Sequence, residues 1–266
     1  MLLEDRVAIV TGGAVGIGKG ISTRFAAEGS KVVIADISEE NGRQTALEIK
    51  KAGGEAIFVK CDVTSREQVF AMVDKAIRTY GKLDILVNNA GGVPGIKGEK
   101  LEEITDDEWQ KFIDLNLKSV FLCCQAAVPH MKKQRYGKIV NFSSLGAVHP
   151  AVSVVHYHAA KGGVISLTYN LCYELAPFNI YVNCICPGPV RTPFWNPVVK
   201  GVKDVDAYFE AIGKREVPLG RVGTPEDIAG TALYLASELS SFVSGQVICV
   251  GGGQPQLPQA ATIAQK

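Results

Sequence analysis

Short apolar segments rich in β-branched residues alternate along the chain with longer segments whose apolar positions recur at helical spacing. Seven short segments are predicted strands: Val7–Val10, Lys31–Ala35, Ala56–Lys60, Ile85–Val87, Lys138–Phe142, Ile180–Ile185 and Gln246–Val250. Consecutive apolar positions are typical of parallel strands that helices cover on both faces. The alternation therefore predicts an α/β fold with a doubly wound, seven-stranded parallel sheet flanked by helices on both faces.

Helix boundary signals lie between these segments. Gly29 follows the first expected helix, while Ser38 and Ser65 stand near the starts of the second and third. Thr224 and Pro225 open a late helix. Because no linker interrupts the alternation, we expect one domain over residues 1–253. Residues 254–266, rich in Gln, Ala and Pro, are expected to form a tail over the surface or a neighbouring subunit.

The charge balance of the chain excludes several classes of partner. The 266 residues include 28 basic and 27 acidic side chains, which leave a net charge of +1. Without a long run of either sign, we expect no binding to nucleic acid or to an anionic membrane. The start, MLLEDRVAIV, lacks the pattern of a signal peptide, and the sequence contains no apolar run of membrane-spanning length. These features predict a cytoplasmic protein.

A glycine-rich turn, TGGAVGIG, separates the first predicted strand from the first predicted helix. Such glycines permit a tight turn and let a pyrophosphate approach the backbone, while the helix N-terminus offers N–H groups to an anion. The alternative is an ordinary connection, but the order strand, turn, helix favours dinucleotide binding. We expect cofactor contacts from Gly12, Val15, Gly16, Ile17 and Gly18.

Asp36 ends the second predicted strand, 18 positions after Gly18. A carboxylate there can accept hydrogen bonds from the adenosine ribose hydroxyls. It also repels the 2′-phosphate of NADP, and the neutral neighbours Val15 and Ile37 do not offset that repulsion. The alternative role for Asp36 is that of a turn residue at the end of a strand. We predict NAD as the cofactor, with Asp36 and Ile37 beside the adenosine ribose.

A second group of candidate residues lies in the middle of the chain. Ser144 follows a predicted strand, and Tyr157 and Lys161 are four residues apart on one helix face. Tyrosine has a reference pKa of about 10 and is a poor base near neutral pH, but a nearby ammonium lowers the pKa of a phenol. These residue types suit proton removal from an alcohol during hydride transfer. A lone Tyr-x-x-x-Lys is also common on surface helices.

Taken together, these motifs resemble those of the classical short-chain dehydrogenase/reductases, from about Arg6 to Gly253. The matching pieces are TGGAVGIG, CDV at 61–63, NNAG at 88–91, DLNLKSVF around Asn116, SSLGA at 143–147, YHAAK at 157–161 and CPGPVRTP at 186–193. One departure is Val250-Gly251-Gly252-Gly253, where members usually have Asp-Gly-Gly. It concerns a local turn or a subunit contact, not the chemistry.

The resemblance implies a Rossmann-type domain and a role for each matching residue. Asn116, Ser144, Tyr157 and Lys161 would form a catalytic tetrad, in which Asn116 supports a proton relay through Lys161. Tyr157 and Lys161 would also contact the cofactor. Further cofactor contacts are implied for Asp62, Val63, Asn89, Ala90, Gly91, Pro187, Gly188, Val190 and Thr192. A lid over residues 190–217 and a homotetramer, assembled through helices near 105–134 and 157–177 and through the C-terminal region, are also implied.

The predicted activity is hydride transfer between NAD(H) and a secondary alcohol or ketone, such as a cyclic alcohol or a hydroxyacyl compound, including a hydroxyacyl-CoA. Polyol, sugar or hydroxysteroid substrates stay open, as does a dinucleotide-binding sensor or inactive partner without catalysis. Lys200, Lys203, Lys214 and Arg215 could bind a CoA group or could simply be a solvated surface. Phe194 and Trp195 fit either an apolar pocket or a core or interface role.

Two further residue types have open interpretations. The seven cysteines are odd in number and irregular in spacing, which argues against a disulfide framework. Small buried apolar side chains are the expected reading, with a redox or metal role for Cys184 and Cys186 as the alternative. We therefore predict no metal site. His149, His156 and His158 fit solvent exposure or a satisfied hydrogen bond, and the alternative is substrate contact, most of all for His149.

Overall fold

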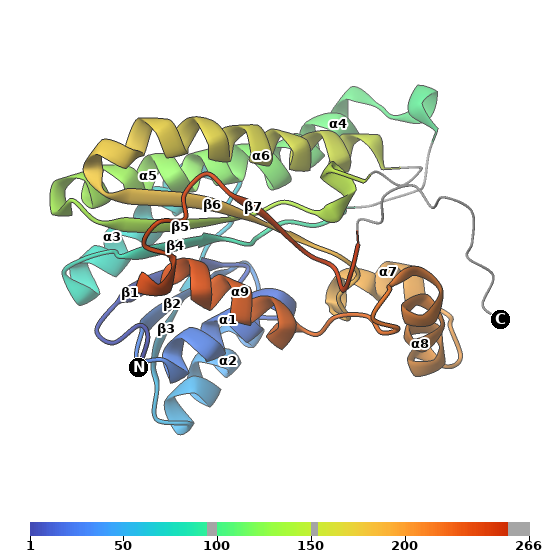
Figure 1. The fold of residues 1–266 in the computed structure, drawn as a ribbon, viewed down its shortest axis with the longest axis horizontal. Helices are drawn as coiled ribbons and strands as arrows, with labels where there is room; N and C mark the ends of the chain where they lie inside the picture. Colours follow the sequence, from blue (N-terminus) through green and yellow to red (C-terminus); the bar gives the residue numbers. More distant parts are fainter. Residues whose placement is uncertain (95–99, 150–153, 255–266) are drawn as a thin grey trace.

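The computed structural model describes residues 1–94, 100–149 and 154–254. At its centre is a seven-stranded parallel sheet in the order β3-β2-β1-β4-β5-β6-β7 (Figure 1). The strands are β1 (Val7–Thr11), β2 (Lys31–Asp36), β3 (Glu55–Lys60), β4 (Ile85–Asn88), β5 (Gly137–Phe142), β6 (Ile180–Pro187) and β7 (Val247–Val250). The predicted seven-stranded, doubly wound sheet is confirmed. The strand order reverses direction between β1 and β4, which is where ligands bind in such sheets.

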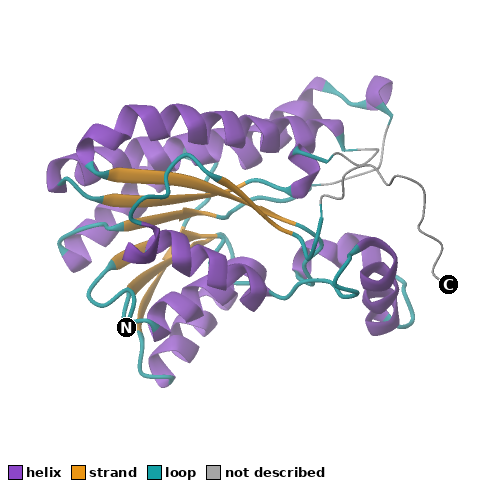
Figure 2. Cartoon of the chain, viewed as in Figure 1, coloured by secondary structure: helices purple, strands orange, loops and turns teal. Residues whose placement is uncertain are grey.

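Helices cover both faces of the sheet (Figure 2). They are α1 (Gly16–Ala27), α2 (Glu39–Lys51), α3 (Arg66–Tyr80), α4 (Asp106–Ile113), α5 (Ser119–Gln134), α6 (Val155–Leu175), α7 (Asn196–Val199), α8 (Val205–Glu216) and α9 (Pro225–Ala236). Apolar side chains of α3, α5 and α6 form one core cluster, and those of α1, α2 and α9 form the other. Within β1, Ile9 belongs to the first cluster, while Ala8 and Val10 belong to the second. Burial on both faces explains the consecutive apolar positions in the strands.

Most of the predicted helix boundaries show the expected capping hydrogen bond or backbone conformation. Ser65 accepts the N–H of Gln68, and Thr224 accepts that of Asp227 in a capping box. Gly29 has a φ of 89°, the left-handed conformation expected after a helix. Ser38 stands at the start of α2, although its side chain makes no capping hydrogen bond.

One helical stretch, Asp106–Gln134, is long and apolar enough to cross a membrane by length and composition. Half of its most apolar window is buried inside the domain. The α5 part lies against the sheet and supplies Leu122 and Ala127 to the first core cluster. This placement is that of a core helix.

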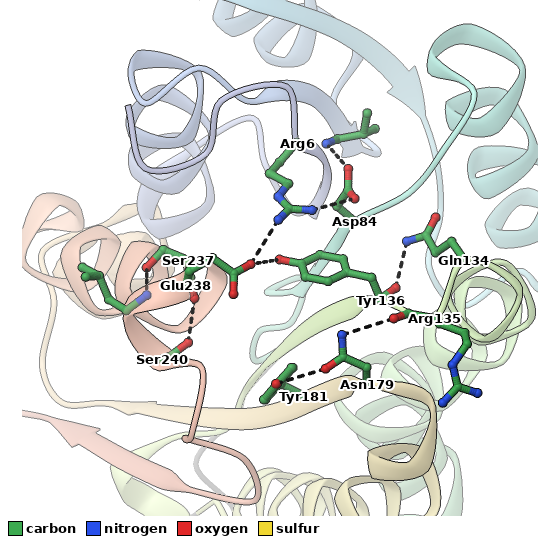
Figure 3. Close-up of polar contacts among 12 residues, drawn as sticks. Arg6, Asp84, Gln134, Arg135, Tyr136, Asn179, Tyr181, Ser237, Glu238 and Ser240 are labelled. Atoms are coloured by element: carbon green, nitrogen blue, oxygen red, sulfur yellow. Dashed lines mark hydrogen bonds and ion pairs between the residues drawn. The ribbon is translucent and has the colours of Figure 1, made fainter.

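Polar side chains join the amino ends of the central strands (Figure 3). The Arg6 guanidinium pairs with Asp84 at 3.4 Å and with Glu238 at 3.0 Å. Tyr136 Oη donates to the same Glu238 carboxylate at 2.9 Å, and the buried Asp84 accepts the N–H of Val7 at 2.9 Å. These contacts tie the starts of β1, β4 and β5 to the segment after α9. The candidate site lies at the opposite side of the sheet, at the carboxyl ends of the strands.

Candidate active site

The turn between β1 and α1 has a backbone that favours glycine. Gly12 and Gly16 have φ values of 60° and 54°, and a Cβ on Gly18 would lie 2.0 Å from the carbonyl oxygen of Gly12. Val15 occupies the N-cap of α1, and its apolar side chain cannot accept a hydrogen bond. The first N–H groups of α1 therefore remain available to an anion, and the turn fits a pyrophosphate.

Asp36 lies beside this turn, at the carboxyl end of β2. Its carboxylate accepts the N–H of Ala14 at 3.1 Å and that of Ser38 at 3.0 Å. These two bonds fix the side chain next to the phosphate turn. Ile37 is largely exposed and Val15 is partly exposed, so both present apolar surface at this edge.

The ends of β1 and β4 are joined by side-chain hydrogen bonds. Asn89 Nδ2 donates to the carbonyl oxygens of Thr11 at 2.9 Å and Gly12 at 3.1 Å. The Thr11 hydroxyl accepts the N–H groups of Asn89 and Ala90, both at 3.1 Å, and donates to Val87. Thr11 therefore shapes the glycine turn, although the sequence analysis did not include it among the site residues. The signal in the sequence for this role of Thr11 was a polar residue at the end of an otherwise apolar strand.

Asp62 and Val63 follow β3 at the same edge. One Asp62 oxygen accepts both the N–H and the hydroxyl of Thr64, at 2.9 and 2.7 Å, and Val63 is buried. The N–H of Cys61 donates to the carbonyl oxygen of Asp36 at 3.0 Å, so the segment starts beside the end of β2. The fold thus brings both residues to the edge that carries Asp36.

Asn116 lies in a π-helical turn, Asp114–Lys118, that joins α4 to α5. It is fully buried, and its Nδ2 donates to the carbonyl oxygens of Phe112 at 3.1 Å and Gly92 at 2.9 Å. Its Oδ1 accepts the N–H of Gly92 at 2.9 Å. The two bonds to Gly92 attach the π-helical turn to the segment that follows β4, and the bond to Phe112 stays within the helix.

Lys161 and Asn116 meet at Gly91. Lys161 Nζ donates to the carbonyl oxygen of Phe142 at 2.9 Å. A Cβ on Gly91 would lie 2.8 Å from Asn116 Oδ1 and 3.1 Å from Lys161 Nζ. Tyr157, one turn before Lys161 on α6, has its ring centroid 5.8 Å from that Nζ. Ser144 follows β5, and its hydroxyl accepts the N–H of Gly146 at 3.1 Å and lies close enough to Tyr157 to influence the pKa of the phenol. The structure therefore brings the four candidate catalytic residues together.

Burial dominates the electrostatics of this group. It raises the pKa of Tyr157 to about 12, although the hydrogen bond from Ser144 opposes this shift. Burial also lowers the pKa of Lys161 to about 8. The expected lowering of the pKa of Tyr157 by the Lys161 ammonium is therefore not seen in this structure, because desolvation of the phenolate is the largest effect.

The start of the expected lid lies against the glycine turn. A Cβ on Gly16 would be 3.2 Å from Thr192 Cβ. Gly188 donates its N–H to Val250 at 3.0 Å, Pro187 ends β6, and Val190 is buried. The residues expected to border the nicotinamide thus lie at the carboxyl end of β6, next to the predicted phosphate turn.

The two lid aromatics have different surroundings. The ring of Phe194 lies 6.2 Å from that of Tyr157 between centroids, and Phe194 remains 40% exposed. Trp195 packs edge-on to Phe209 of α8 at 5.9 Å and donates its Nε1–H to Val190. Phe194 therefore fits the pocket interpretation, and Trp195 fits the core interpretation.

The three histidines differ in their burial and in their neighbours. His156 is buried and stacks on Phe112 with 3.6 Å between ring centroids. His158 packs over Gly146, where a Cβ would lie 2.3 Å from its Nε2. His149 is exposed. Burial and packing agree with a structural role for the first two, and substrate contact by His149 stays a hypothesis.

All seven cysteines are free thiols, and five of them are buried: Cys61, Cys123, Cys124, Cys184 and Cys186. Within residues 1–94, 100–149 and 154–254, the structure has no cluster of three or more His, Cys, Asp or Glu that could hold a metal. The metal alternative for Cys184 and Cys186 therefore gains no support from the described part of the chain.

A glycine turn at the switch point of a doubly wound sheet, beside a half-buried tyrosine and a buried lysine, defines a dinucleotide-binding oxidoreductase. Residues 12–254 match the family described as enoyl-(acyl carrier protein) reductase. The 3-oxoacyl-(acyl-carrier-protein) reductase of Chlamydia muridarum is 41% identical over 253 residues, which are 95% of this chain and 98% of that protein. The L-fucose dehydrogenase of Oryctolagus cuniculus is 39% identical, over 93% of this chain and 84% of that protein.

The crystal structure of levodione reductase is also similar, with a TM-score of 0.88 and 31% identity over 95% of this chain and 98% of that one. The chain belongs to the short-chain dehydrogenase/reductase family, whose members use nicotinamide dinucleotide cofactors.

Proposed function

We propose that this protein transfers a hydride between NAD(H) and a secondary alcohol or its ketone, with Tyr157 as the acid/base. The observation that supports this most directly is the convergence of Asn116 Oδ1 and Lys161 Nζ on Gly91, with Tyr157 and Ser144 beside them. A protein that only bound a dinucleotide would have no need for this arrangement.

The residues at the edge of the sheet fit the parts of NAD. The pyrophosphate would lie on the turn from Gly12 to Gly18, and the adenosine ribose hydroxyls would donate to Asp36. Because Val15 and Ile37 carry no charge, the carboxylate of Asp36 would disfavour a 2′-phosphate, and we therefore propose NAD over NADP. Lys161 would hold the nicotinamide ribose. Bound NAD supplies the hydride acceptor, and NADH supplies the hydride donor.

Residues of the chain itself would transfer the proton to or from the substrate oxygen. Ser144 would hold the substrate oxygen by a hydrogen bond, and Tyr157 would give its phenolic proton to that oxygen during ketone reduction. In alcohol oxidation the Tyr157 phenolate would accept the proton. Asn116 would keep Lys161 within reach of a proton relay. The raised pKa of Tyr157 keeps its proton in place at neutral pH, which suits the reductive direction.

For the substrate we propose a compound with an apolar ring or acyl chain next to the reacting carbon, either a cyclic alcohol or a hydroxyacyl compound. The partly exposed ring of Phe194, 6.2 Å from that of Tyr157, would form an apolar wall for such a group. The similarity to levodione reductase and to 3-oxoacyl-(acyl-carrier-protein) reductase agrees with this choice. Polyols, sugars and hydroxysteroids are the alternatives, and the similarity to L-fucose dehydrogenase keeps sugars among them.

We also propose one domain over residues 1–253, a lid over 190–217 and a homotetramer. The tail expected over residues 254–266 lies, apart from Gln254, outside the described residues. Phe121 of α5 and Tyr169 and Tyr173 of α6 are 45%, 45% and 85% exposed, so these helices present aromatic surface to a second copy. Light scattering tests the assembly, and a monomer would contradict it.

The function is tested by following NADH formation with NAD, and with NADP in parallel, over cyclic alcohols, hydroxyacyl-CoA esters, polyols and hydroxysteroids. Tyr157→Phe should lose at least a hundredfold in kcat while still binding NADH, because only the proton donor is removed. Tyr173→Phe, the same change at an exposed α6 position, is the matched control. Near wild-type turnover in Tyr157→Phe would refute the role of Tyr157. NADH binding without turnover on any substrate would favour a non-catalytic protein.

A further inference from the structure

Two consecutive residues at the carboxyl end of β5 hold both ends of Lys161. The carbonyl oxygen of Phe142 accepts a hydrogen bond from Lys161 Nζ at 2.9 Å, and the Ser143 hydroxyl donates to the carbonyl oxygen of Lys161 at 2.7 Å. Ser143 and Lys161 are both buried. The backbone of Lys161 and its terminal amine are therefore both fixed to the same strand.

A second contact of this kind lies further along α6. Asn141 Nδ2 donates to Thr168 Oγ1 at 3.0 Å, and both residues are fully buried. Asn141 and Ser143 are two positions apart, so their side chains project from the same face of the sheet. Lys161 and Thr168 are two turns apart on one face of α6, which separates them by about 10 Å along the helix axis. Strand and helix are thus joined at two separate points.

The two contacts hold different parts of α6. The Ser143 bond lies in the part that carries Tyr157 and Lys161, whereas the Thr168 bond lies two turns beyond it. If the Ser143 hydroxyl is removed, the helix stays fixed at Thr168 and only its first part can move. The carbonyl oxygen of Lys161 keeps its N–H partner within the α-helix, so the change should leave the protein folded.

We propose that Ser143 is a positioning residue for the reaction. Its hydroxyl fixes the first part of α6 against β5, which keeps Lys161 Nζ at the Phe142 carbonyl and beside Gly91. This inference rests on the proposed function, in which Lys161 holds the nicotinamide ribose. A displacement of about 1 Å in a catalytic group lowers the rate by up to roughly a hundredfold. Ser143→Ala should therefore lower kcat by about tenfold or more.

Hydrogen exchange tests the contact without cofactor or substrate. In Ser143→Ala, amide exchange should become about threefold faster or more around residues 157–165 and stay unchanged around 168–175. Thr168→Val should lower the melting temperature further than Ser143→Ala does, because the buried Asn141 amide loses its acceptor. Since Ser143 still holds Lys161 in that variant, kcat should stay within about threefold of the wild type.

Ser30→Ala is the matched control for the loss of a serine hydroxyl. Ser30 is equally buried, and its hydroxyl donates to the carbonyl oxygen of Arg6 at 2.9 Å, at the amino ends of the strands. Ser30→Ala should keep the wild-type kcat and the wild-type exchange of α6.

NADH binding shows whether Ser143 acts through Lys161. Ser143→Ala should raise the Kd for NADH by about threefold or more in the wild-type background, but should change it little in Lys161→Met, since coupled residues are not additive. This comparison needs no turnover. A wild type that binds NADH and reduces no ketone would contradict the proposed function, and the binding cycle and the exchange would still test Ser143.

Three results would overturn the proposal. One is unchanged exchange around Lys161 in Ser143→Ala. Another is a kcat of Ser143→Ala that stays within about threefold of the wild type or falls no further than that of Ser30→Ala. The third is an equal rise in the Kd for NADH with and without the Lys161 side chain.

Discussion

Replacing Gly91 by alanine tests the geometry of the proposed site most directly. A Cβ there would lie 2.8 Å from Asn116 Oδ1 and 3.1 Å from Lys161 Nζ, whereas ordinary contacts are about 3.5 Å or longer. Asn116 is held by three hydrogen bonds and Lys161 Nζ by one to Phe142. One of these polar groups must therefore move, and both belong to the proposed relay.

The expected effect on stability is modest, and that on activity is large. Two such close contacts cost about 1–3 kcal/mol if the side chains must shift, which lowers the melting temperature by roughly 2 to 10 °C in a domain of this size. A shift of Asn116 or Lys161 by a fraction of an ångström to 1 Å lowers kcat by up to about a hundredfold. The assay measures kcat well below the melting temperature, so that unfolding does not contribute.

Gly92→Ala is the matched control, since a Cβ on Gly92 would meet no atom within 4 Å. Neither glycine has a left-handed φ, so alanine introduces no backbone strain at either position. Gly92→Ala should keep kcat within about threefold of the wild type. The reasoning is refuted if Gly91→Ala also keeps it, or if the two variants lose activity equally.

Three further predictions concern the cofactor, the amino edge of the sheet and pH. Asp36→Asn removes the carboxylate charge but keeps an acceptor, so the ratio of Kd for NADP to Kd for NAD should fall about tenfold or more; an unchanged ratio would contradict this. Asp84→Ala should lower the free energy of unfolding in urea by about 1–3 kcal/mol, because the buried N–H of Val7 loses its acceptor. An altered kcat would show that the amino ends of the strands are not independent of the candidate site. Alcohol oxidation needs the Tyr157 phenolate, so its rate should rise with pH through the neutral range and continue to rise above pH 8, because the pKa of Tyr157 is raised to about 12. Ketone reduction should fall above pH 8 as Lys161, whose pKa is lowered to about 8, loses its charge; reduction that stayed constant to pH 10 would contradict this.

The sequence was sufficient for the fold because its main signals are local. Each predicted strand lies within two residues of its expected bounds, since continuous apolar runs mark strands buried on both faces. The glycine turn and Asp36, which ends β2, could also be predicted, because a fixed number of residues separates them along the chain. The positions of Asn116 and Lys161 relative to Gly91 were not, because they depend on packing among three distant segments.

Electrostatic behaviour was the least accessible property. The residue types at positions 157 and 161 indicate attraction between an ammonium and a phenolate. The effect of burial, which raises the pKa of Tyr157 and lowers that of Lys161, becomes visible only in three dimensions.

The π-helical turn at Asp114–Lys118 also divides a continuous helix into two parts with different rotational phase. Each residue of an α-helix advances the side-chain direction by about 100°, so the extra residue of the turn rotates all of α5 relative to α4. Phe112, before the turn, stacks on His156, while Leu122, after it, belongs to the core cluster that α3, α5 and α6 form against the sheet. Deleting a single residue here would keep an unbroken helix and yet turn one of these faces away from its partner. The helix therefore tolerates substitution more readily than a change in length.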